Sequence, residues 1–219
     1  MAQTRVALFD LDRTLVRMET ASLFVRYRRD RGEATFRDTV RVAYWAAQYT
    51  FGRIDASDVA ARALAALSGL PEAELVRQCE EWFPKYVAQH ICARARRAVD
   101  THLFRGNDVA IVTGASPYAA RPVARALGIE HVVASDLEVD GSGLLTGRFV
   151  EPLCYGIGKK LLALRLGRRL GFTLEEAMFY SDSATDLPLL QAVGEPVAVN
   201  PDRRLRRVAE QLNWRIEHW

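Results

Sequence analysis

Cysteine is scarce in this sequence of 219 residues, which contains only Cys79, Cys92 and Cys154. None of the three belongs to a Cys-x-x-Cys pair and no histidine cluster accompanies them, so a zinc site is not expected. A small, odd number of cysteines also argues against a framework of disulfides. We therefore expect a protein of a reducing compartment, with the cytoplasm as its location.

Long apolar segments are lacking as well. No run of about 18 apolar residues occurs, so no membrane-spanning helix is expected. The first residues lead directly into a short apolar run at residues 6–9. They lack the basic start, apolar stretch and cleavage site of a signal peptide, so we expect none.

A strong excess of charge is also missing, because 30 basic residues stand against 27 acidic ones. The basic run at residues 203–207 has no aromatic residues between its arginines, and we interpret it as the solvated face of a helix. Nucleic acid is therefore not an expected partner. The sequence does not indicate an oligomeric state.

Short apolar runs do occur, and they predict the strands of an α/β fold. The run at residues 6–9 ends in Asp10, and similar runs stand at residues 108–113, 131–134, 177–180 and 196–199. Helical patterns separate the later runs, which favours a Rossmann-like parallel sheet flanked by helices. Residues 137–139 and 144–149 flank a glycine-rich turn and predict a β-hairpin.

The stretch from about residue 20 to residue 100 has a different pattern. Its apolar residues recur at steps of three and four, as at residues 40–47 and 59–67, which predicts four or five helices and no strand. Pro71 and the polar residues 55–58 are expected at helix starts. We therefore expect a helical domain at residues 19–100, inserted into an α/β core of residues 1–18 and 101–219.

Four carboxylates follow two of the predicted strands. Asp10 and Asp12 come after the first strand, and Asp182 and Asp186 come after the strand at residues 177–180. Each pair alone is explained by capping of a turn or a helix. Because parallel strands bring their carboxyl ends to one edge, the pairs should meet there, where like charges repel unless a cation neutralises them. Mg²⁺ suits such a site, since it prefers oxygen ligands.

Groups that suit a phosphate stand at the same predicted edge. Thr113 offers a hydroxyl after the second strand. Gly158 and Lys159 open a predicted helix, where the ammonium and the backbone N–H groups favour an anion. Lys160 is adjacent, and the residue types alone do not separate the two lysines.

Together these segments resemble the haloacid dehalogenase superfamily of phosphohydrolases. The resemblance rests on Phe-Asp-Leu-Asp-Arg-Thr-Leu at residues 9–15, Val-Thr-Gly-Ala-Ser at 112–116, Gly-Lys at 158–159, and Tyr-Ser-Asp-Ser-Ala-Thr-Asp at 180–186. The Asp-x-Asp-x-Thr element is the most specific of these. The helical insertion after the first motif is similar to the cap of the phosphoserine-phosphatase-like branch.

The resemblance implies a role for each matched residue. Asp10 would attack phosphorus and form an aspartyl-phosphate, while Asp12 would protonate the leaving oxygen and then activate water. Thr113, Gly114 and Lys159 would hold the phosphoryl group. Mg²⁺ would be bound by Asp10, Asp182 and the backbone carbonyl of Asp12, and Asp186 would support the metal or orient Lys159. The implied activity is a Mg²⁺-dependent phosphatase acting on a small phosphate ester.

Some residues depart from the pattern or bear on specificity. Arg13 and Ser181 replace smaller residues of many relatives, and we expect Arg13 to point to solvent rather than to bind phosphate. Glu19 stands nine residues after Asp10, where phosphoserine phosphatases resemble this chain in carrying a glutamate that contacts the substrate amine. A substrate with a cationic group, such as phosphoserine or another amino-phosphate, is therefore one expectation.

Two other functions stay open. A lipid-headgroup phosphatase would dock through arginines of the helical insertion, such as Arg26, Arg28 and Arg29. A non-catalytic phosphate sensor would use the same fold, but it would not need to keep both Asp10 and Asp12. Dehalogenation is disfavoured, because the acid Asp12 and the expected metal ligands suit phosphate.

Overall fold

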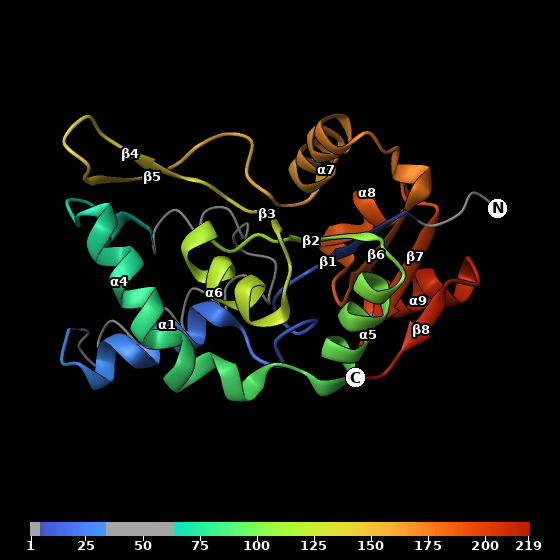
Figure 1. The fold of residues 1–219 in the computed structure, drawn as a ribbon, viewed down its shortest axis with the longest axis horizontal. Helices are drawn as coiled ribbons and strands as arrows, with labels where there is room; N and C mark the ends of the chain where they lie inside the picture. The colour runs from blue at the N-terminus through green and yellow to red at the C-terminus, as the bar shows by residue number, and fades with distance from the viewer. Residues whose placement is uncertain (1–4, 34–63) are drawn as a thin grey trace.

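The computed structural model describes residues 5–33 and 64–219. Six parallel strands form one sheet in the order β3-β2-β1-β6-β7-β8, with the buried strand β1 in its interior (Figure 1). The expected fold class, a parallel sheet flanked by helices, is confirmed. The strands are β1 (Val6–Phe9), β2 (Asp108–Val112), β3 (His131–Val133), β6 (Ala177–Ser181), β7 (Glu195–Val199) and β8 (Arg215–Glu217).

Side chains that alternate along the strands divide the core into two layers. On β1, Ala7 and Phe9 pack with α5 and α6, whereas Val6 and Leu8 pack with α7, α8 and α9 on the opposite face. Both faces of the sheet are thus covered, as a parallel sheet requires. The helices are α5 (Ala93–Phe104), α6 (Pro117–Leu127), α7 (Ile157–Leu170), α8 (Leu187–Leu190) and α9 (Arg203–Gln211), with short 3₁₀ turns η3 (Leu174–Glu176) and η4 (Ala184–Asp186).

Along the chain, further helices follow β1 and precede β2. The ring of Trp82, fully buried at the end of α4, meets Phe24 of α1 edge-on with the ring centroids 5.7 Å apart. The helices expected at residues 40–47 and the caps expected at residues 55–58 lie outside the described residues. The described elements before α5 are α1 (Thr20–Asp30), α4 (Glu72–Trp82), the π-helical turn η1 (Phe83–Val87) and the 3₁₀ turn η2 (Ala88–His90).

The two stretches that link this helical segment to the sheet run side by side. Cys92 N donates to Leu15 O at 2.9 Å, and Arg17 N donates to His90 O at 2.9 Å. The expected division at residue 100 falls within α5, whose buried residues pack with β1 and β2. The chain therefore returns to the sheet layer at the start of α5.

The expected hairpin is present as β4 (Leu137–Val139) and β5 (Leu145–Phe149), which pair antiparallel. It extends from the sheet toward α4 (Figure 1). Gly69 N donates to Leu145 O at 2.8 Å, and Leu145 N donates to Leu70 O at 2.9 Å. The hairpin follows the third core strand in sequence, yet its tip is hydrogen-bonded to the helical segment.

The sixth strand, β8, was not expected from the sequence. It has three residues at the edge of the sheet and pairs with β7 alone. Its sequence, Arg-Ile-Glu, leaves no apolar run to detect, unlike the equally short edge strand β3. Within the described residues, none of the helices has the length and apolar character needed to cross a membrane.

Candidate active site

Asp10 and Asp12 stand at the carboxyl end of β1. The backbone N–H of Asp10 donates to Tyr180 O at 2.9 Å, which continues the pairing of β1 with β6 for one more residue. Asp12 Oδ1 accepts a hydrogen bond of 2.8 Å from Thr20 N at the start of α1. The first carboxylate is therefore tied to the sheet, and the second is tied to the entry of the helical segment.

Lys159 lies between two carboxylates in the buried interior of the site. Its Nζ donates to Asp10 Oδ1 at 2.8 Å and to Asp186 Oδ2 at 2.7 Å, while Ser181 Oγ donates to the same Asp186 oxygen at 2.7 Å. Lys159 is only 3% exposed, whereas its neighbour Lys160 is half-buried. The geometry therefore selects Lys159 as the lysine that contacts Asp10.

Gly158 explains how Lys159 is brought there. A Cβ placed on Gly158 would lie 2.0 Å from the carbonyl oxygen of Leu153, a distance that no side chain tolerates. Glycine therefore lets the first turn of α7 approach the preceding loop closely. In the Gly-Lys pair, Gly158 permits the close packing of α7 against Leu153, and Lys159 supplies the positive charge beside Asp10.

Burial and mutual repulsion set the acidity of these groups. Burial raises the pKa of Asp10 well above its usual value, Lys159 opposes this rise, and Asp186 and Asp182 add to it. Burial alone lowers the pKa of Lys159, but the adjacent Asp10 and Asp186 carboxylates outweigh it and raise that pKa. Burial likewise raises the pKa of Asp182 to about 7, although the charge of Arg13 lowers it. The single positive charge of Lys159 does not neutralise the three buried carboxyl groups of Asp10, Asp182 and Asp186.

Asp12 is placed differently from these acids. Burial raises its pKa, and hydrogen bonding from Thr20 opposes the rise. Its Oδ1 accepts from the Thr20 N–H at 2.8 Å, at the entry of α1. A carboxyl group with a raised pKa is suited to hold and release a proton near neutral pH.

Thr113 and Gly114 follow β2 at the same edge. Thr113 N donates to Val133 O at 2.9 Å, and Thr113 Oγ1 accepts from Ala115 N at 3.1 Å. The hydroxyl hydrogen of Thr113 is not used in that contact, so it can be donated to an anion. Gly114 is exposed and precedes the first turn of α6, which is capped by Ser116. Thr113 is thus a fixed donor next to an accessible backbone.

The acids fit a divalent cation. Asp186 Oδ1 is buried without a hydrogen-bond partner in the described part of the chain, and such an atom calls for an ion or water. No cluster of three or more metal-binding side chains occurs within residues 5–33 and 64–219. A cation here would therefore use two carboxylates and other oxygens, which matches the preference of Mg²⁺ for one or two carboxylates with water and phosphate.

Arg13 extends to the exposed surface, as expected, and its Nη2 lies there 2.7 Å from Glu19 Oε1. Both side chains remain accessible, at 60% exposed for Arg13 and 49% for Glu19. The backbone of Arg13 is in the left-handed region, with φ of 57°. The charge of Glu19, which the sequence suggested for a substrate amine, is therefore balanced by a residue of the same loop.

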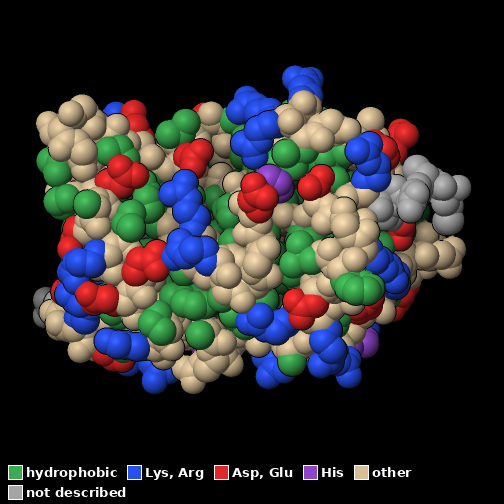
Figure 2. Space-filling model, viewed as in Figure 1, with side chains coloured by type: hydrophobic (Ala, Val, Ile, Leu, Met, Phe, Trp, Pro, Cys, Tyr) green, Lys and Arg blue, Asp and Glu red, His purple; other side chains and the backbone are tan. Residues whose placement is uncertain are grey.

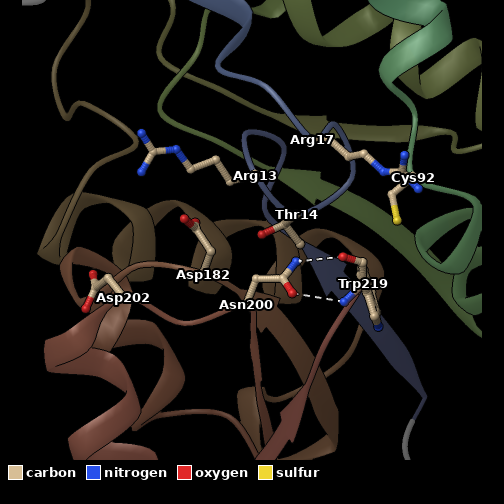
Figure 3. Close-up of a pocket in the computed structure, with 8 residues that line it drawn as sticks. All are labelled: Arg13, Thr14, Arg17, Cys92, Asp182, Asn200, Asp202 and Trp219. Atoms are coloured by element: carbon tan, nitrogen blue, oxygen red, sulfur yellow. Dashed lines mark hydrogen bonds between the residues drawn. The ribbon is translucent and has the colours of Figure 1, made fainter.

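A cavity of about 410 Å³ opens beside Asp182. Figure 3 shows that Arg13 and Arg17 extend from one loop toward opposite ends of it, with Asp182 near Arg13, and Cys92 and Trp219 at the Arg17 end. Sequence analysis missed Arg17 and Trp219, which are far apart in the chain and carry no motif. The described lining residues are Arg13, Thr14, Arg17, Cys92, Asp182, Asn200, Asp202 and Trp219.

Comparison with known proteins supports the resemblance. Residues 7–191 match the model of the haloacid dehalogenase-like hydrolase family. The chain is 38% identical to phosphoserine phosphatase SerB1 of Mycobacterium tuberculosis, over 97% of this chain and 70% of the relative. It is 29% identical to a histidinol-phosphatase of Neisseria meningitidis, over 96% and 97%. A protein of unknown function from Bordetella pertussis has the same fold, with a TM-score of 0.90, 30% identity and 99% of both chains covered.

Proposed function

This chain belongs to the haloacid dehalogenase-like hydrolase family and is a phosphatase, and we propose that it hydrolyses a small phosphate monoester with Asp10 as nucleophile and Mg²⁺ as cofactor. The observation that carries the proposal is the buried contact of Lys159 with both Asp10 and Asp186. A structural ion pair does not need a third acid, Asp182, at the same edge. Three acids around one lysine suit a site that receives a cation and a phosphate.

Asp10 performs the first step. Lys159 holds its Oδ1 at 2.8 Å, while no described residue forms a hydrogen bond to Oδ2, which is free to attack phosphorus. The new Oδ2–P bond forms as the ester P–O bond breaks. Asp12 donates its proton to the leaving oxygen, as its raised pKa favours. The products are an alcohol and an aspartyl-phosphate.

Asp12 also acts in the second step. Its carboxylate takes a proton from water, the water oxygen bonds to phosphorus, and the P–O bond to Asp10 breaks. Phosphate leaves, and Asp10 is regenerated as a carboxylate. Thr113 and Lys159 position the phosphoryl oxygens in both steps and offset their charge, which is the main requirement of phosphoryl transfer.

Mg²⁺ would be held by the carboxylates of Asp10 and Asp182 and by the backbone carbonyl of Asp12, with Asp186 in support. When bound, it supplies positive charge that stabilises the phosphoryl oxygens. The protein's own contribution is to keep these acids at one edge of the sheet. Asp186 does so through its hydrogen bonds with Lys159 and Ser181.

We propose that the helical segment acts as a cap. On the packing of α5 against the sheet, its second boundary is better placed near Cys92 than at residue 100. The hinge in this proposal is the pair of adjacent linkers at Leu15 and Cys92. Closure would exclude bulk water from the aspartyl-phosphate.

A small phosphorylated metabolite is favoured over a lipid headgroup. Arg26 and Arg29 of α1 each form an ion pair with Asp30, and Arg28 pairs with Glu33. On the face drawn in Figure 2, acidic and basic side chains are interspersed over this part of the molecule. Paired arginines attract an anionic membrane less than free ones do. The cytoplasmic location stays a prediction, consistent with the three free cysteines.

Phosphate release tests the proposal. Purified protein is incubated with an aryl phosphate, phosphoserine, phosphoethanolamine, histidinol phosphate and a lysophospholipid phosphate, with Mg²⁺ or with EDTA. We expect release that requires Mg²⁺ and is lost in Asp10→Asn. The matched control is Asp108→Asn, which changes an exposed carboxylate on the same sheet and should leave the rate unchanged. Release that survives in Asp10→Asn would disprove the nucleophile.

A further inference from the structure

Helix α7 turns a row of large apolar side chains outward. Ile157, Leu161 and Leu164 are 61%, 45% and 36% exposed. They follow one another at steps of four and three residues, so they form a single stripe along the helix. One exposed apolar residue needs no explanation, whereas a contiguous group of large ones is typical of a surface that contacts a partner.

Basic residues border this apolar stripe. On a helix with about 3.6 residues per turn, Lys160 falls on one side of the stripe and Arg165 on the other, while Arg168 continues its line. The side chains of Lys160, Arg165, Arg168 and Arg169 form no ion pair or hydrogen bond with the described residues. We call the stripe and these four cations together the outer face of α7. Its positive charge is not compensated by a neighbouring side chain.

Acidic residues are scarce around this helix. α7 contains no Asp or Glu, and β3 and α8, which pack against it, contain none either. η3 contributes Glu175 and Glu176, and Glu176 is already engaged by Thr173 and Arg5. Figure 2 shows Lys and Arg side chains at its upper edge, where α7 lies in Figure 1. The outer face of α7 is therefore both apolar and net positive.

The outer face is separate from the proposed catalytic centre. Lys159 is buried on the opposite side of the helix, where it contacts Asp10 and Asp186. Leu166 lies on the same inner side and belongs to the core beneath the sheet. A partner can therefore cover the outer face without contact with the groups that act on the phosphate.

The chemistry of the outer face discriminates between possible partners. A second copy of this chain on a two-fold axis would bring the same cations together, which their repulsion disfavours. A nucleic acid backbone offers phosphates, but it gives the leucine side chains no apolar environment. An anionic lipid bilayer offers both, since its phosphates bind guanidinium groups and its acyl chains receive apolar side chains.

We propose that the outer face of α7 docks the protein on an anionic lipid surface, with the apolar stripe at the boundary of headgroups and acyl chains and the cations on lipid phosphates. The arginines of α1 contribute less, because they are paired with acids. The lipid is here a docking surface and not the substrate, so the inference agrees with a small soluble ester as the substrate. It does not depend on the proposed phosphatase function.

Co-sedimentation with vesicles tests the inference. The purified chain is mixed with vesicles of equal parts phosphatidylglycerol and phosphatidylcholine, or of phosphatidylcholine alone, at low and at high NaCl concentration. We expect binding to the anionic vesicles that is weaker at high salt, because salt screens the attraction. Binding to the neutral vesicles should be at least about tenfold weaker, since they lack the charge that attracts the cations.

Two double variants examine the two parts of the outer face. Arg165→Gln with Arg168→Gln should weaken binding to the anionic vesicles at least about tenfold. Ile157→Gln with Leu161→Gln should also weaken it, and the binding that remains should still be salt-dependent. The matched control, Arg203→Gln with Arg207→Gln, removes two exposed arginines of α9, which have no exposed apolar residue between them, and should bind like wild type.

The melting temperature and phosphate release from a soluble ester without vesicles should be the same in all three double variants and in wild type. Failure of folded wild type to bind the anionic vesicles would overturn the inference, and so would equal binding to both kinds of vesicle. A loss of binding in the α9 control as large as in the α7 variants would show general attraction rather than docking by α7. A dimer of wild type that Ile157→Gln with Leu161→Gln dissociates would assign the outer face to a second copy and would overturn the inference as well.

Discussion

Two groups of ion pairs in this molecule use the same chemistry in opposite settings. Lys159 contacts Asp10 and Asp186 in the interior and is 3% exposed. Arg77 of α4 contacts Glu74 and Glu81 at the surface, where its side chain is 49% exposed. Water competes for the charges of α4 and is excluded from those of Lys159.

The difference in burial between the two groups decides whether their ion pairs can be explained by stability alone. An exposed ion pair contributes little to stability, because hydration of its members is nearly as favourable as their contact. A buried set is expensive to desolvate, and removing one member leaves the others uncompensated. The interior set therefore has a requirement other than stability, which the proposed chemistry provides.

Replacing Lys159 tests this contrast with the largest expected effect. Lys159→Met leaves two buried carboxylates without their cation, so the free energy of unfolding in EDTA at pH 7.5 should fall by about 3–5 kcal/mol. Phosphatase activity should be lost at any Mg²⁺ concentration. Urea denaturation measures the first effect, and phosphate release measures the second.

The matched surface variant is Arg77→Met, which should unfold at the same urea concentration as wild type within experimental error. The two variants remove a cation of similar length from two neighbouring acids. If Lys159→Met were as stable as wild type, the buried carboxylates would be protonated already. The nucleophile assignment would then fail at that pH.

The pH dependence of stability is the second test. The pKa of Asp182 is raised to about 7 by burial, so this group stabilises the metal-free fold fully below about pH 4 and loses that effect as pH rises through 7. Metal-free protein should therefore be less stable at pH 8 than at pH 5, by at most about 3 kcal/mol from this group. Mg²⁺ should remove most of the decline, because it stabilises the carboxylate form.

Urea denaturation at pH 5, 6, 7 and 8, with EDTA or Mg²⁺, measures this effect. Asp182→Asn isolates it, since the variant should decline less in EDTA and gain less from Mg²⁺ than wild type. Other carboxylates titrate in both proteins, so the difference between them is the quantity of interest. A difference that does not change between pH 5 and pH 8 would contradict the raised pKa.

Gly158 links the buried charges to local packing. Gly158→Ala places a Cβ 2.0 Å from Leu153 O, so the first turn of α7 must move and carry Lys159 with it. We expect a loss of about 1–3 kcal/mol in stability and a fall in kcat. The control is Gly141→Ala, because a Cβ there meets no atom within 4 Å. Equal melting temperatures for both variants would show that the contact relaxes freely.

The sequence predicted the sheet better than it predicted the surroundings of the site. The strand at residues 6–9 is an apolar run, because both of its faces are buried, and such runs are visible in a sequence. The edge strand β8 was missed, because its residues Arg-Ile-Glu contain a single apolar side chain. The linker pairing at Leu15 and Cys92 was also missed, because contacts across 77 residues have no local signal.

The candidate site shows the same limit. Spacing after the strands brought Asp10, Asp12, Thr113 and Asp182 into consideration, since strand ends meet at one edge. The choice between Lys159 and Lys160 required the structure, because only the direction of each side chain separates them. Arg13 is exposed, as expected, but its ion pair with Glu19 was not foreseen, because it forms across a loop with a left-handed residue that the sequence does not reveal.

The Arg13–Glu19 pair is exposed like those of α4, yet it stands beside the site, so it should affect selectivity rather than stability. Asparagine tolerates a left-handed backbone, so Arg13→Asn removes the charge with little change in the loop. The freed Glu19 carboxylate should then attract an amine. We expect the ratio of kcat/KM for phosphoethanolamine over ethyl phosphate to rise about two- to fivefold, the scale of an exposed pair. Effects of Arg13 on Asp182 act on both esters and cancel in this ratio. The rise should vanish in the Arg13→Asn, Glu19→Gln double variant, and if it persisted there, Glu19 would have no part in selecting the substrate.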